Sequence, residues 1–202
     1  MQIFFDFDGT LVDSRMRLFA LFKKLVPSCR FSFDEYWDLK RNKISHIQIL
    51  REIFSYNDIQ LSEFDKQWML NIENTEWLAF DKPYTGVTEF LNKIKSNHLL
   101  YVVTARQLNN MVDKQIESFG WLGIFEEVFV TENKIEKCDL IRHVVLTESE
   151  GWFVGDTGKD IQTGKKLGLK TAAITSGFLS FESLKFYNPD IIVNSLEELV
   201  FI

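Results

Sequence analysis

The chain has 202 residues, a formal net charge of −6 and two cysteines, and 46% of its residues are hydrophobic. This length allows one substantial core with room for an inserted subdomain, and the negative charge disfavours binding to nucleic acid. Cys29 and Cys138 show no CxxC pattern or metal-ligand spacing, so we expect free thiols in a reducing compartment. Since neither a membrane-length apolar run nor a basic leader is present, we expect a cytoplasmic protein without a membrane partner.

The first predicted element is a short buried strand at residues 3–5, which leads into the run DFDGTL at residues 6–11. Residues i and i+2 of a strand share a face, so Asp6 and Asp8 are expected to point toward one site. Two carboxylates this close repel each other unless a cation or a shared proton relieves the repulsion. A polar turn alone would explain the glycine that follows, but not two acids on one face. The run therefore predicts a metal site.

Residues 14–81 are predicted to form an all-helical insertion. Apolar residues recur at helical spacing after Leu11 and continue to about Phe80, and no strand is expected among them. Pro27 ends the first of these helices, and Ser32 or Asp34 caps the next.

A basic cluster, KRNK at residues 40–43, falls at a break between two of these predicted helices. Arg41 and Lys43 either contact a substrate carboxylate or a second phosphate, or belong to a solvated surface run. Arg15, just after the first motif, has the same two interpretations.

Strands and helices alternate from residue 82 onward. A helix is predicted from Val87 to near Asn97, followed by strands at 99–103, 127–130, 151–154, 171–174 and 190–193 with helices at 111–119, 135–146 and 161–167. This alternation is typical of a mainly parallel α/β sheet with helices on both faces. We therefore expect a core formed by residues 1–13 and 82–202, with ligands bound at the carboxyl ends of its strands.

Polar residues follow two of these later strands. Thr104 and Ala105 begin a loop whose hydroxyl and N–H groups suit an anion, although a threonine taken alone is more often the cap of the next helix. Arg106 is expected to pair with a phosphate or with a surface carboxylate.

Asp156 and Asp160 lie about one helical turn apart after another strand. Each also has a simpler interpretation: Asp156 as a helix cap, and Asp160 as a solvated acid in the first turn of the helix. Together with Asp6 and Asp8, these acids suit Mg²⁺.

These motifs, in this order, resemble those of the haloacid dehalogenase-like (HAD) hydrolases, and most closely the phosphoglycolate phosphatase-like members, which have a Rossmann-like core and a helical cap. The resemblance implies that Asp6 is the nucleophile and Asp8 the general acid/base. It also implies that Mg²⁺ is held by Asp6, the backbone carbonyl of Asp8, Asp156 and Asp160. The family lysine is expected at Lys137, with Lys134 as the alternative, and neither is followed by the proline that many members have.

The resemblance thus implies a Mg²⁺-dependent phosphatase that hydrolyses a small phosphate monoester through an aspartyl-phosphate. The expected substrate-binding residues are Thr104, Ala105, Arg106, Lys137, Arg41 and Lys43. Two alternatives stay open: a phosphomutase of the β-phosphoglucomutase type, and a non-catalytic phosphate- or partner-binding protein. Dehalogenation is disfavoured, because Asp8 would have no leaving alkoxide to protonate. The sequence fits either a monomer or a homodimer and does not name the substrate.

Overall fold

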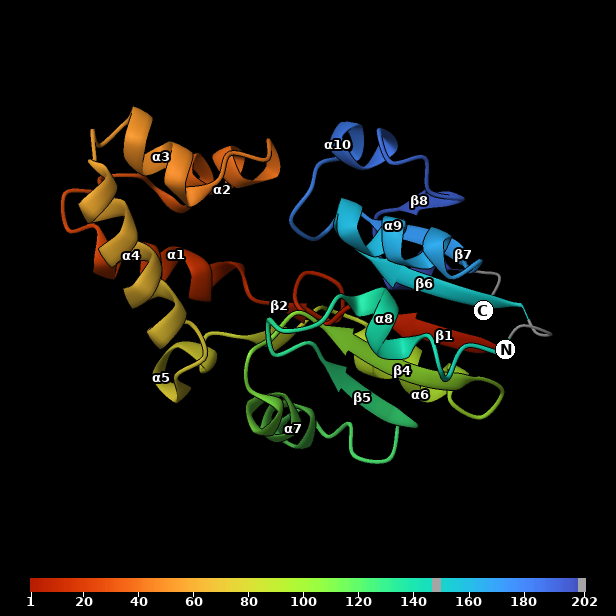
Figure 1. The fold of residues 1–202 in the computed structure, drawn as a ribbon. Coiled ribbons are helices and arrows are strands. Elements are labelled where there is room, and N and C mark those ends of the chain that lie inside the picture. The colour runs from red at the N-terminus through yellow and green to blue at the C-terminus, as the bar shows by residue number, and fades with distance from the viewer. Residues whose placement is uncertain (147–149, 200–202) are drawn as a thin grey trace. The chain divides into compact units, whose positions relative to one another are not determined.

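The computed structural model of the chain describes residues 1–146 and 150–199. Its contacts divide the chain into two compact units, which are described separately. The first, here called the core unit, comprises Met1–Asp13 and Lys82–Ile202; the second, the helical unit, comprises Ser14–Asp81. Figure 1 shows the strands gathered in the core unit. In the described ranges, no helix is both long and apolar enough to cross a membrane.

The core unit is built on a six-stranded sheet in the order β5-β4-β1-β6-β7-β8, and every neighbouring pair is parallel. The strands are β1 (Gln2–Phe5), β4 (Leu99–Thr104), β5 (Glu127–Val130), β6 (Gly151–Gly155), β7 (Lys170–Ile174) and β8 (Ile191–Val193). The predicted α/β class is confirmed. All four residues of β1 are buried, since it has a strand on each side and packed side chains on both faces.

Helices cover both faces of this sheet. One face carries α6 (Val87–Ile94), α7 (Asn109–Ser118) and the 3₁₀ turn η1 (Leu196–Glu198), and the other carries α8 (Lys137–Ile141), α9 (Gly158–Lys166) and α10 (Phe181–Lys185). Alternation along β1 divides its side chains between them: Ile3 and Phe5 pack with α6, whereas Phe4 packs with Ile141 of α8. The ladder continues past the strand, because the Asp6 N–H donates to the Val154 carbonyl at 2.9 Å. Asp6 therefore shares the face of Phe4 and of α8.

The helical unit contains α1 (Arg15–Leu25), α2 (Phe33–Arg41), α3 (His46–Glu52), α4 (Asp58–Asn71) and α5 (Thr75–Leu78). Capping boxes begin three of them, at Ser32, Ser45 and Asn57, so Ser32 rather than Asp34 caps α2. Its interior is aromatic: the His46 ring lies 5.2 Å from that of Phe22 and 4.2 Å from that of Trp68.

Two expectations about secondary structure were wrong. A two-residue strand, β2 (Val12–Asp13), pairs antiparallel with β3 (Lys82–Pro83) where no strand was expected. A two-residue strand is too short to show a periodic sequence pattern, and it forms only because a distant segment pairs with it. The helix expected over 135–146 is confined to α8. Beyond it the Gln2 side chain binds the Val144 carbonyl and the Leu146 N–H, both at 2.8 Å, in place of helical hydrogen bonds.

Candidate active site

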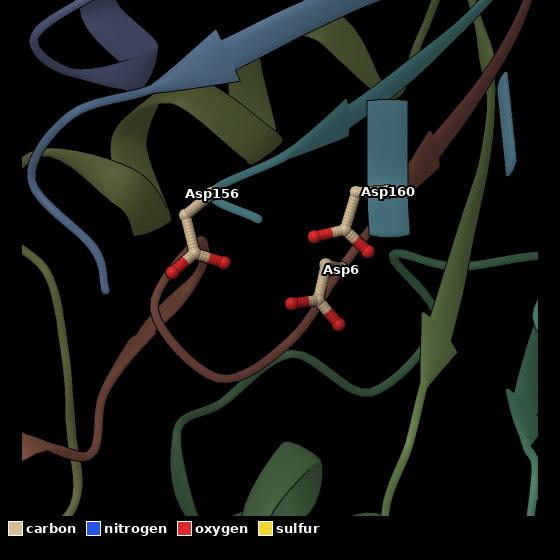
Figure 2. Close-up of side chains that lie close together, drawn as sticks. All are labelled: Asp6, Asp156 and Asp160. Atoms are coloured by element: carbon tan, nitrogen blue, oxygen red, sulfur yellow. The ribbon is translucent and has the colours of Figure 1, made fainter. Parts of the chain in front are cut away.

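Three carboxylates converge at the carboxyl ends of β1 and β6. Asp6 follows β1, Asp156 follows β6, and Asp160 lies in the first turn of α9. One carboxylate oxygen from each lies within 4.8 Å of the others, and all three residues are buried. Figure 2 shows the three side chains around a common space. The parallel topology explains the meeting, because the central strands β1 and β6 are neighbours and end at the same edge.

Lys137 joins this group from the start of α8. Its Nζ lies 2.6 Å from Oδ1 of Asp6 and 2.7 Å from Oδ1 of Asp160. The alternative, Lys134, is exposed and pairs with Glu132 at 2.6 Å. Of the two candidate lysines, the fold therefore brings Lys137 to the carboxylates.

The interpretation of Asp160 as a solvated acid was wrong, because the residue is fully buried. Its Oδ2 accepts hydrogen bonds from the N–H (3.0 Å) and the hydroxyl (2.5 Å) of Thr157, the N-cap of α9. Its Oδ1 faces Lys137. A single side chain thus closes a capping box and anchors the lysine. Because Thr157 occupies the N-cap, the interpretation of Asp156 as a helix cap was also wrong.

Asp156 is held by two groups to which the sequence assigned no role. Its Oδ2 accepts the Phe178 N–H at 2.6 Å, and its Oδ1 accepts the Thr10 hydroxyl at 3.2 Å. Thr10 belongs to the first motif, whereas Phe178 lies in the loop after β7. Gly177 is the sequence feature that could have pointed to this loop. Only glycine fits there, because a Cβ would lie 2.2 Å from the Asp156 carboxylate.

Burial is the main cause of the shifted pKa values of Asp6 and Asp156. Burial raises the pKa of Asp6 to about 7, although Lys137 opposes the rise. Burial, together with the charges of Asp6 and Asp160, raises the pKa of Asp156. Burial by itself lowers the pKa of Lys137, but the Asp160 and Asp6 carboxylates outweigh it and raise that pKa above its usual value. Additional positive charge near these groups would favour the ionised forms of Asp6 and Asp156.

The donor set fits Mg²⁺, because it consists of closely spaced carboxylate oxygens, the ligands that this hard cation prefers. Within the part of the chain that the structure describes, Asp6, Asp156 and Asp160 are the side chains that could hold the ion. The Asp8 carboxylate lies apart from this set and is engaged by Arg106. The expected participation of Asp8 through its backbone carbonyl stays a prediction.

Arg106 donates two hydrogen bonds to the Asp8 carboxylate. Its Nη2 lies 2.8 Å from Asp8 Oδ1, and its Nε donates to Oδ2. Arg106 is buried, so its partner is an acid of the site rather than the surface carboxylate that the sequence allowed. Thr104, the last residue of β4, is buried as well. Ala105 and Lys137 line a pocket of about 290 Å³ together with residues of the loop after β5 and of α9.

The remaining candidates belong to the helical unit. Arg41 ends α2, and Lys43 lies in the following turn with a φ of 64°. Arg15 stacks over the Trp37 ring, 5.8 Å from its centroid. The basic cluster is partly structural, since Lys40 donates to the Ile44 carbonyl at 3.1 Å. Contact of these residues with a substrate stays a prediction.

Comparison with known proteins decides the family. A model of the haloacid dehalogenase-like hydrolases matches residues 3–174. The chain belongs to this family. The family predicted from the four motifs is thereby confirmed.

Relatives of this HAD-like chain match it over nearly its full length. A phosphoglycolate phosphatase of Aquifex aeolicus is 24% identical, over 98% of this chain and 94% of its own. A pyrophosphatase of Bacillus velezensis is 26% identical, over 99% of this chain and 94% of its own. A solved structure of a haloacid dehalogenase-like hydrolase from Streptococcus pneumoniae superposes with a TM-score of 0.80 at 21% identity, covering 99% of this chain and 97% of that chain.

Proposed function

We propose that this protein is a Mg²⁺-dependent phosphatase that hydrolyses a small phosphate monoester through an aspartyl-phosphate on Asp6. One observation carries the proposal: the Asp6 carboxylate contacts Lys137 and lies within 4.8 Å of two further buried acids, at the carboxyl edge of a parallel sheet. The family membership supports hydrolysis, and the names of the relatives support phosphorylated substrates.

Asp6 is suited to attack phosphorus because its carboxylate is fixed by Lys137 at the end of a rigid central strand. The attack forms an aspartyl-phosphate and releases the leaving group, so one difficult step becomes two easier ones. Asp8 protonates the leaving oxygen and then accepts a proton from the water that hydrolyses the intermediate.

In this mechanism the phosphoryl oxygens are bound by the Thr104 hydroxyl, the Ala105 N–H and the Lys137 ammonium group. Two observations support this role: Thr104 ends β4, and Lys137 contacts Asp6. When bound to Asp6, Asp156 and Asp160, Mg²⁺ supplies positive charge that offsets the charge of the phosphoryl oxygens. Lys137 also compensates the charges of Asp6 and Asp160, and so holds the nucleophile in place.

The helical unit, with Arg41 and Lys43, is the proposed cap that selects the substrate. The substrate class is a small phosphorylated metabolite, and phosphoglycolate and pyrophosphate are the first to test, because they are the substrates in the relatives' names. Both cysteine thiols are free and buried, in keeping with the proposed cytoplasmic location.

The experiment is phosphate release from a panel of phosphate esters and pyrophosphate, with Mg²⁺ or with EDTA, in the wild type and in Asp6→Asn. We expect Mg²⁺-dependent turnover that Asp6→Asn abolishes. Asp65→Asn makes the same chemical change at an exposed position of the helical unit and should leave turnover unchanged. Turnover that survives Asp6→Asn would contradict the mechanism. Activity only in the presence of a sugar bisphosphate would favour the phosphomutase, and no turnover would favour the non-catalytic alternative.

A further inference from the structure

Arg106 and Asp8 form a two-point ion pair in the core unit. The guanidinium donates from Nε and Nη2 to the two oxygens of one carboxylate. The Arg106 side chain is 4% exposed and that of Asp8 is 18% exposed, so the arginine is enclosed and the acid keeps an open side. A paired fork of this kind fixes the plane of a carboxylate as well as its position.

An aromatic contact and a backbone hydrogen bond hold Arg106 in place. Its guanidinium carbon lies 5.7 Å from the centroid of the Phe7 ring, and that ring meets Trp121 edge to face at 6.3 Å. Its backbone carbonyl accepts the Glu132 N–H at 3.0 Å, which ties the loop after β4 to the loop after β5. The arginine is therefore held at both ends, and the orientation that it imposes on Asp8 is well defined.

We propose that Arg106 is a positioning residue that orients the Asp8 carboxylate for proton transfer to the leaving oxygen, and that it does not bind the substrate phosphate. The inference rests on the proposed function, because it takes Asp8 as the group that carries the proton. Proton transfer requires the donor and acceptor oxygens to lie within hydrogen-bond reach, and rotation of an aspartate about its two side-chain torsions moves its oxygens out of that reach. The Arg106 fork removes this freedom. The Nε–Nη2 edge of the guanidinium, which could bind a phosphate with two parallel hydrogen bonds, is already used on Asp8, and Nη1 is buried.

The dependence of kcat/KM on the leaving group separates positioning from phosphate binding. The first substrate is p-nitrophenyl phosphate, whose leaving group departs without protonation, and the second is glycerol phosphate, whose alkoxide needs a proton. Because kcat/KM reports steps up to transfer of the phosphoryl group to Asp6, it includes the departure of the leaving group. General acid catalysis contributes about 10²–10⁴-fold, so its loss is measurable.

The variants are Arg106→Met, Arg106→Lys, Asp8→Asn and the double variant Asp8→Asn/Arg106→Met. We expect Arg106→Met to lower kcat/KM for glycerol phosphate by at least about tenfold more than for p-nitrophenyl phosphate, through kcat rather than KM. Arg106→Lys, which keeps the charge and loses the fork, should recover only part of this loss. In the Asp8→Asn background, Arg106→Met should cause no further loss on glycerol phosphate. Arg142→Met, at an exposed arginine of the core unit, is the control.

Three outcomes would overturn the inference. Equal losses on both substrates, expressed in KM, would mean that Arg106 binds the phosphate. A lower melting temperature with an unchanged substrate ratio would mean that it only stabilises the fold. Additive losses in the double variant would mean that it acts independently of Asp8. A failure of the proposed function is recognised separately, because it appears in the wild type as no turnover, or in Asp8→Asn as no difference between the two substrates.

Discussion

Nε of Arg17 lies 3.2 Å from Oδ1 of Asp81, and this ion pair joins the first helix of the helical unit to the last residue of that unit. The two side chains are 3% and 0% exposed. Arg17 also donates from Nη1 to the Ile72 carbonyl at 3.3 Å. The pair therefore closes the helical unit at the point where the chain enters and leaves it.

Removing one partner of this buried pair should destabilise the helical unit strongly. Asp81→Ala removes a buried carboxylate that lies against the buried Arg17 guanidinium, and we expect a loss of about 3–5 kcal/mol in the free energy of unfolding, measured in urea. Arg51→Gln breaks an exposed pair with Asp58 in the same unit and should cost less than about 1 kcal/mol. Equal costs for the two variants would show that burial does not set the strength of the Arg17 pair.

The stability of the helical unit should fall at acid pH because of His46. Burial, with the nearby Lys40 charge, lowers the pKa of His46 well below its usual value, and the ring is hydrogen-bonded to the Tyr36 hydroxyl at 2.8 Å. The unfolded chain then binds a proton more readily than the folded chain. Stability is therefore complete above the unfolded pKa of 6.5 and falls as pH drops below it, by at most about 1.4 kcal/mol per pH unit from this group.

Urea unfolding between pH 8 and pH 5 measures this effect. His46→Gln keeps a hydrogen-bonding partner for the Tyr36 hydroxyl and cannot take up the proton, so its stability should depend less on pH. The control is His143→Gln, at an exposed residue of the core unit. An unchanged pH dependence in His46→Gln would contradict the assignment.

A methyl group at Gly9 should disrupt the acidic cluster. Gly9 has a φ of +85°, and a Cβ there would lie 2.2 Å from Oδ2 of Asp156. We expect Gly9→Ala to displace that carboxylate, to weaken Mg²⁺ binding and to lower turnover at least about tenfold, since small misplacements of reacting groups are costly. Calorimetric titration with Mg²⁺ and phosphate release are the measurements.

Gly168→Ala is the matched control for this change. Gly168 has a φ of +73°, and its Cβ would meet no atom within 4 Å. Gly168→Ala therefore introduces only the backbone strain. We expect it to lower the free energy of unfolding by about 1 kcal/mol and to leave Mg²⁺ binding unchanged. If both variants lost Mg²⁺ binding equally, the close approach to Asp156 would not be the cause.

Mg²⁺ should stabilise the wild-type protein, and Asp6→Asn should be the more stable protein in EDTA. Without the ion, the pKa of Asp6 is about 7 in the folded chain against 3.8 as a model value, mainly because of burial. The folded state then binds the extra proton, so stability falls as pH rises from about 4 to 7 and stays low above it. Asparagine removes this cost. Melting temperatures at pH 8, with EDTA or with Mg²⁺, test both statements, and a wild type insensitive to Mg²⁺ would contradict the metal site.

The sequence by itself determined the class of the fold and most of the acids of the site. Strand runs such as 151–154 could be located because buried parallel strands are continuously apolar. Asp6, Asp156 and Asp160 could be assigned to one site because parallel strands bring their carboxyl ends to the same edge.

Only the tertiary structure decided which partner each polar side chain takes. The choice between Lys134 and Lys137, the pairing of Arg106 with Asp8, and the contact of Phe178 with Asp156 join residues up to 131 positions apart. The end of α8 and the ribbon of β2 with β3 also depend on distant segments. Local periodicity reports which side chains are buried, whereas hydrogen bonds and ion pairs depend on distances of a few ångströms that packing alone sets.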